Sequence, residues 1–157
     1  MTSALVRIPV GVTVERRKGK GPWAGDLWRP LAVFAGVPAA APWTIIHSAE
    51  AATTFYAGEA VIDLYRTETD NYRSNLAAEH PLLWVILRRT ESASGVELRG
   101  VTADPAEGEA LTGAGNDVVE SVPMAASIRE TVGAFVARHH VERPMFKRQR
   151  DRSGRQQ

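Results

Sequence analysis

The histidines are the first residues of this chain that could do chemistry. His139 and His140 are adjacent, and Glu142 follows closely. His47 and His80 lie far away in the sequence. Adjacent residues of an α-helix point in directions about 100° apart, so such a pair does not readily hold one metal ion. We therefore expect no metal site, and we expect His139 and His140 to stabilise a helix C-terminus, where cations are favoured.

Nucleophilic and cofactor motifs are incomplete. The chain has no cysteine, which excludes thiolate nucleophiles, disulfide bonds and thiolate metal sites. No Gly-x-Ser-x-Gly sequence is present to expose a serine nucleophile. Residues 113–118 begin like a dinucleotide-binding loop, but they lack its third glycine and follow a predicted helix, so they predict a helix end. We expect no catalytic residue and no cofactor.

The densest polar stretch, residues 64–76, offers hydrogen-bonding groups. Glu68, Tyr72 and Asn75 are spaced by four and three residues, so one face of a helix can present all three. This face predicts either capping and surface hydrogen bonds or a contact site for a partner. An alternative hypothesis places Glu68, Tyr72 and the histidines around the polar pocket of a small enzyme or ligand-binding β-barrel.

Three tryptophans form a second candidate. Trp23, Trp28 and Trp43 lie close together in the sequence, and Arg29 follows the second of them. Trp and Arg are frequent hot spots of protein interfaces, which favours a recognition surface. Tryptophans that fill one end of a β-sheet core would give the same pattern.

The end of the chain is basic. Residues 138–157 contain seven basic and two acidic residues, whereas residues 1–137 contain twelve basic and sixteen acidic ones, and the net charge is +1. Such a tail attracts acidic surfaces without reading bases, and no aromatic residue follows Phe146 to stack on them. Nucleic-acid binding is therefore only a third hypothesis. The candidate contact residues of the tail are Lys147, Arg148 and Arg150.

Strands must position most of these residues. Apolar residues alternate over residues 6–14 and predict a half-buried strand, in which Pro9 favours an edge position or a bulge. Hairpin turns are predicted at residues 57–59 and 92–95. We expect an α+β, mainly β fold, an antiparallel barrel or sandwich of about seven or eight strands. The other predicted strands are residues 27–34, 43–47, 53–56, 60–66, 82–89, 96–102 and 118–122.

Three helices complete the prediction. One begins at Thr69 and ends before Pro81, and a second has Asp104 as its N-cap with Pro105 in the first turn. A C-terminal amphipathic helix covers about residues 123–140 and packs across the β core. Residues 1–146 thus form one domain, and residues 147–157 a flexible tail.

The sequence also predicts where the protein is found. The longest apolar run, residues 82–87, is far shorter than the ~20 residues of a membrane-spanning helix. No signal-peptide pattern is present at the start of the chain. We therefore expect no membrane span and a cytoplasmic location.

Four pieces of the chain carry a family resemblance. They are residues 10–17 with 22–23 and 28–30, residues 41–44, Glu68 with residues 72–76, and residues 122–124 with 139–142 and 147–148. These pieces resemble an uncharacterised proteobacterial family encoded beside molybdenum-dependent formate dehydrogenase genes. The resemblance implies a non-catalytic accessory or interaction protein of this molybdopterin enzyme, acting in maturation or assembly or as a small subunit. Its implied partners are formate dehydrogenase subunits or maturation proteins.

Overall fold

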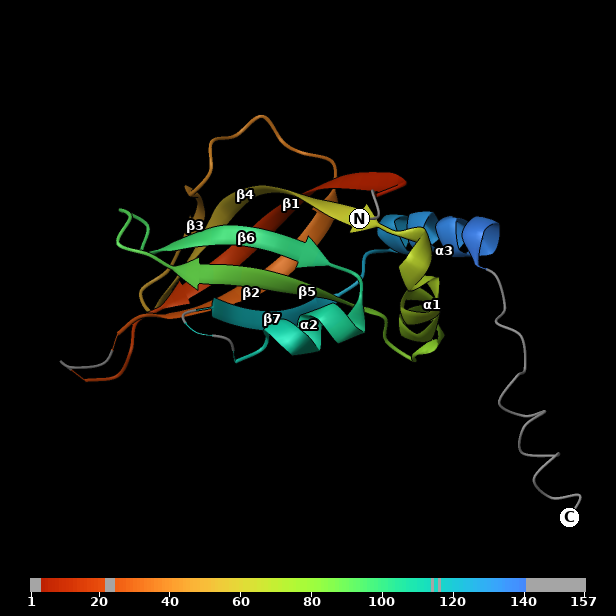
Figure 1. Cartoon of the computed structure of the whole chain (residues 1–157). Coiled ribbons are helices and arrows are strands. Elements are labelled where there is room, and N and C mark those ends of the chain that lie inside the picture. Colours follow the sequence, from red (N-terminus) through yellow and green to blue (C-terminus); the bar gives the residue numbers. More distant parts are fainter. Residues whose placement is uncertain (1–3, 22–24, 114, 116, 141–157) are drawn as a thin grey trace, which may run out of the picture.

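The chain is mainly β in its computed structural model, which describes residues 4–21, 25–113, 115 and 117–140 (Figure 1). The strands are β1 (Val6–Arg17), β2 (Leu27–Ala35), β3 (Thr44–Ser48), β4 (Ala52–Leu64), β5 (Leu82–Arg89), β6 (Val96–Thr102) and β7 (Asp117–Pro123). The helices are α1 (Thr69–Ala77), α2 (Pro105–Leu111) and α3 (Ala126–His139), and a short 3-10 helix (Arg66–Glu68) precedes α1.

The strands form two antiparallel sheets. The first has the order β2-β1-β4-β3 and the second the order β6-β5-β7. β6 lies against β4, and β7 lies against β2. The described strands do not close into a barrel, and β3 is left at the edge of the larger sheet, beyond β4.

One apolar core is shared by both sheets. The alternation predicted for residues 6–14 is confirmed, because alternate residues of β1 are fully buried, and β5 shows the same alternation. Burying each such side chain contributes about 1.5–3 kcal/mol to folding. The fully buried residues of the two strands are Val10, Val12 and Val14 of β1 and Leu83, Val85 and Leu87 of β5.

The helices α1 and α3 lie side by side at one end of the sheets (Figure 1). The buried residues of α3 are Ile128, Val132 and Phe135, spaced by four and three residues, as an amphipathic helix requires. The helix begins at Ala126, a few residues later than predicted, because β7 continues through Pro123.

The predicted hairpin turn at residues 57–59 is wrong. β4 runs without interruption from Ala52 to Leu64, and its register with β1 shifts at this point. Val12 pairs with Gly58 but Thr13 pairs with Tyr56, so Ala57 is the extra residue of a β-bulge. Gly58 has a φ of +128°, which glycine adopts without strain. The turn-like sequence therefore bends a continuous strand.

Pro9 lies in a strand with neighbours on both sides, not in an edge strand. Its carbonyl accepts a hydrogen bond from the Gly36 N–H at 3.2 Å. The nitrogen and the carbonyl of a strand residue point to the same side of the strand. The Pro9 nitrogen therefore faces the side on which β2 lies, but beyond the last residue of that strand, Ala35. The missing N–H therefore removes no hydrogen bond between strands.

Candidate functional site

The predicted polar face of α1 points into the protein. The buried residues of this helix are Thr69, Tyr72 and Asn75. The Asn75 amide nitrogen donates to the Leu82 carbonyl at 2.7 Å and to the Ala103 carbonyl at 3.0 Å. Its amide oxygen accepts from the Leu82 N–H at 3.0 Å. Asn75 thus joins α1 to the start of β5 and to the residues after β6.

Tyr72 has a similar structural environment. Its ring meets Phe135 of α3 edge to face, with centroids 6.1 Å apart, and is only 1% exposed. Its hydroxyl accepts a hydrogen bond from the Tyr65 N–H at 2.9 Å. Burial raises the pKa of the Tyr72 phenol to about 12, so the group is neutral at physiological pH.

Glu68 is the most accessible member of the predicted face. It is half-buried, and its carboxylate accepts hydrogen bonds from Thr67 at 3.0 Å and from Asn71 at 3.3 Å. Glu68 thus lies in the 3-10 helix that precedes α1, whereas Tyr72 and Asn75 lie on the inner face of α1. Their proposed role in protein contact stays a prediction, and burial leaves Tyr72 and Asn75 little surface for it.

The tryptophans form an aromatic cluster at the opposite end of the larger sheet. Trp28 is 7% exposed and packs against Trp43 and Phe55, with ring centroids 5.7 and 5.8 Å away. The Arg16 guanidinium lies 5.1 Å from the Phe55 ring centre and 5.8 Å from that of Trp28. Arg29 is exposed, 3.5 Å from the Glu15 carboxylate. The contact role of Trp28, Trp43 and Arg29 stays a prediction.

Trp43 connects this cluster to β3. Its φ of 69° lies in the left-handed region, which non-glycine residues adopt only at a cost. Its N–H donates to the Tyr56 carbonyl at 2.6 Å, which anchors the start of β3 to β4. The bend lets the Trp43 ring pack inward while the next five residues continue along the sheet edge.

β3, which Figure 1 shows next to β4, is exposed along its whole length. Ile45 is 58% exposed and Ile46 is 55% exposed, and they are the only adjacent pair among the exposed large apolar residues of the described structure. The strand was predicted from the sequence, but these two residues were not selected as a site. Two adjacent isoleucines were a usable signal, because successive strand residues point to opposite faces and one of them faces outward.

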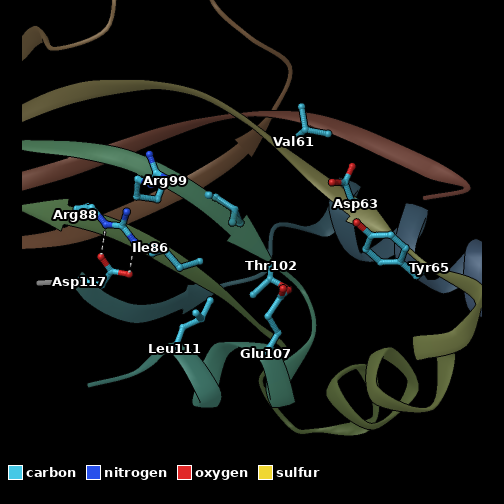
Figure 2. Close-up of a pocket in the computed structure, with 12 residues that line it drawn as sticks. Val61, Asp63, Tyr65, Ile86, Arg88, Arg99, Thr102, Glu107, Leu111 and Asp117 are labelled. Atoms are coloured by element: carbon cyan, nitrogen blue, oxygen red, sulfur yellow. Dashed lines mark hydrogen bonds and ion pairs between the residues drawn. The ribbon is translucent and has the colours of Figure 1, made fainter. Parts of the chain in front are cut away.

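Two adjoining hollows lie beside α2, with volumes of about 340 and 390 Å³. They share Tyr65 and Glu107. Figure 2 shows the first hollow, with Glu107 and Leu111 projecting from α2. The second is also lined by Tyr72, and its acidic residues are Glu68, Asp104 and Glu107.

The charged groups of the first hollow are largely paired. Arg88 donates to both carboxylate oxygens of Asp117, at 2.8 and 3.3 Å (Figure 2). The hydrogen bond from Arg88 holds the pKa of Asp117 below its ordinary value and raises the pKa of Arg88. Asp63 pairs with Arg7 at 2.9 Å. Most of the charge here therefore binds neighbouring side chains.

Comparison with known proteins identifies the family of the chain. A family model described as "Protein of unknown function (DUF3305)" matches residues 9–150. The chain belongs to this family. No curated protein and no solved structure matches the chain. The predicted membership of an uncharacterised family is confirmed, and the association with formate dehydrogenase genes stays a prediction.

The family match includes the histidine pair at the end of α3. His140 is held against α1: its Nδ1 lies 3.2 Å from the Thr69 hydroxyl and its Nε2 lies 3.1 Å from an Arg73 nitrogen. Because a guanidinium only donates, Nε2 accepts, and a neutral ring carries its proton on Nδ1. The His139 ring packs on Phe135 instead, with centroids 4.7 Å apart.

Two further findings concern classes of site. Among the residues that the structure describes, no group of three or more His, Cys, Asp or Glu side chains could hold a metal ion. No helix in the same part of the chain is long and apolar enough to cross a membrane. The predicted contact residues Trp23, Lys147, Arg148 and Arg150 and the predicted tail, residues 147–157, lie outside the described residues.

Proposed function

We propose that the chain is a non-catalytic, cytoplasmic interaction protein that binds a protein partner through the exposed strand β3. The observation that carries this proposal is the pair of isoleucines, each more than half exposed, on an edge strand without a charged residue. Burying the exposed half of one isoleucine contributes on the order of 1 kcal/mol. Natural proteins protect such an edge with charges, proline, β-bulges or a covering segment, and β3 carries a bulge at Ile46 but no charge and no proline.

The polar groups of α1 support the same proposal. Tyr72 and Asn75 form hydrogen bonds with the backbone of Tyr65, Leu82 and Ala103. Their geometry serves to hold the helix on the sheets. The strand β3, at the edge of the larger sheet, carries two exposed isoleucines and has no strand paired with its outer side within the described structure.

The proposed partner is a molybdopterin-dependent formate dehydrogenase or one of its maturation proteins. This part of the proposal rests on the sequence resemblance described above. Roles in maturation, in assembly or as a small subunit all require a protein-binding surface. We further describe the fold as an incomplete sandwich, in which the two sheets face each other and α3 closes one end.

Affinity capture from the native cell under conditions that induce formate dehydrogenase tests this proposal. The test variant is the double substitution Ile45→Thr and Ile46→Thr, and Leu5→Thr is its matched control. Leu5 is 48% exposed, and its N–H bonds to Leu64 at the far end of β4. We expect dehydrogenase subunits or maturation proteins to be captured by the unsubstituted chain and the control, but not by the double variant. If none of the three chains captures dehydrogenase subunits or maturation proteins, or if all three capture them equally, the proposal is overturned.

A second candidate function is supported by the hollow that Glu68 and Tyr72 share with Glu107. Its carboxylates and neutral phenol would suit a small cationic or hydrogen-bonding ligand. A thermal-shift screen of small amines tests it, with Glu107→Gln as the variant. Stabilisation by an amine that disappears in this variant would support a ligand-binding protein.

A further inference from the structure

β3 differs from every other edge strand of the described structure. The edge strands β2, β6 and β7 each contact a strand of the opposite sheet, whereas β3 pairs with β4 and extends beyond it. Ile45 pairs with Phe55 and His47 with Thr54, so Ile46 is the extra residue of a bulge. Because β3 has no strand on its outer side, this edge offers unpaired N–H and C=O groups beside two exposed isoleucines, although the Thr44 N–H already bonds to the Ala41 carbonyl at 3.3 Å.

A basic hollow lies where β3 ends. It has a volume of about 210 Å³ and is lined by Arg16, Lys18, Glu50 and the backbone turn from Ser48 to Thr53. Lys18 is exposed and forms no ion pair with any residue that the structure describes. The nearest carboxylate that pairs with Arg16 is Asp26, at 3.9 Å. Arg16 thus has a carboxylate partner, whereas Lys18 is the cation of this hollow that is left for an additional negative charge.

We infer that β3 receives an extended segment of a partner protein that consists of uncharged, β-forming residues followed by acidic ones. The segment adds a strand to β3 through backbone hydrogen bonds, its apolar side chains cover Ile45 and Ile46, and its carboxylate reaches Lys18. Strand addition supplies affinity through the main chain, and the pockets beside the strand supply specificity. This inference rests on the proposed function and names the chemistry of the partner.

A second copy of the chain fits this surface less well. In a two-fold antiparallel pair of β3 strands, the basic hollow of one copy faces residues 41–44 of the other. These residues are Ala41, Pro42, Trp43 and Thr44, and they contain no acid. An extended segment with an acidic end supplies the missing charge.

Synthetic peptides test the inference by fluorescence anisotropy with the full chain. The probe is a labelled peptide of alternating valine and threonine that ends in two glutamates. One comparison peptide ends in two lysines, and another carries N-methyl groups on alternate backbone nitrogens. We expect the acid-ended peptide to bind, the lysine-ended peptide to bind about three- to ten-fold more weakly, and the N-methylated peptide not to bind.

Lys18→Glu is the test variant, and Lys20→Glu is the matched control, because Lys20 is exposed but does not line the hollow. The first should weaken binding of the acid-ended peptide about three- to ten-fold, with a smaller difference at high salt, and the second should leave it nearly unchanged.

Several results would overturn the inference. They are no binding of the acid-ended peptide up to about 1 mM, equal binding of the N-methylated peptide, or equal effects of the two lysine variants. A dimer in sedimentation that the double isoleucine variant dissociates would assign β3 to a second copy. Selective peptide binding without capture of a dehydrogenase would reject the proposed partner and leave strand addition standing. If capture of a dehydrogenase depends on the isoleucines but the chain does not distinguish between the peptides, the proposed partner stands and addition of an acid-ended strand is rejected.

Discussion

Replacing Asn75 by alanine should be among the most destabilising polar substitutions in this chain. The side chain is 5% exposed and makes three hydrogen bonds to the backbone of Leu82 and Ala103. Asn75→Ala leaves the N–H of Leu82 and the carbonyls of Leu82 and Ala103 without this partner. The contact with Ala103 is buried and those with Leu82 are partly buried, so we expect a loss of roughly 3–5 kcal/mol in the free energy of unfolding.

Urea unfolding followed by tryptophan fluorescence measures this loss, and thermal unfolding should show a midpoint lower by roughly 10 °C. The matched control is Asn71→Ala on the same helix, because Asn71 makes one hydrogen bond, to Glu68 at 3.3 Å. We expect this control substitution to lower the free energy of unfolding by less than about 1 kcal/mol. Equal costs for the two variants would refute the structural role assigned to Asn75.

Three further predictions test the packing and the titration of buried groups. Gly108→Ala would place a Cβ in steric overlap with the Trp84 ring and should destabilise by about 1–3 kcal/mol in urea unfolding, whereas Gly133→Ala meets open space on α3 and should stabilise by up to about 1 kcal/mol. Asp104→Ala removes the side chain that accepts the first N–H groups of α2 and should cost about 1 kcal/mol in the same assay; an unchanged midpoint would contradict the capping role. Tyr72 has its pKa raised from 10.0 to about 12 in the folded protein, so its contribution to stability is complete below pH 10 and is lost as the pH rises toward 12. Absorbance titration at alkaline pH should show a phenol with a pKa of about 12 in the unsubstituted chain that is missing in Tyr72→Phe, whereas Tyr56, whose pKa is also raised by burial and by Glu59, titrates in both chains.

Local signals in the sequence were sufficient for much of the fold. Alternating valines predicted the buried face of β1, and Asp104 followed by Pro105 predicted the start of α2, where the Asp104 carboxylate accepts from the Ala106 N–H at 2.9 Å. These features depend on a few neighbouring residues. The residues 57–59 misled the prediction because glycine serves a turn and a bulge equally well, and only pairing with β1 decides between them.

Burial of α1 could not be predicted in the same way. Its buried residues, Thr69, Tyr72 and Asn75, carry polar groups, and its larger apolar residues, Tyr72 and Leu76, are too few to identify the inner face by a hydrophobic pattern. The spacing of Tyr72 and Asn75 did predict that they share a face. Their partners, the backbone groups of residues 65, 82 and 103, come from three separate segments, which only the folded chain brings together.

The structure therefore reverses the usual relation between polarity and exposure at two places. A polar helix face is buried because each of its buried groups finds a hydrogen-bond partner, which offsets the cost of desolvation. The two isoleucines of β3 are exposed because the smaller sheet contacts the larger one at β4 and β2, whereas β3 lies outside these contacts. A hydrogen-bonded interior face gains nothing by opening, whereas the exposed isoleucines and the unpaired edge of β3 gain free energy when covered. For this reason β3, rather than α1, is the surface at which a partner should be sought.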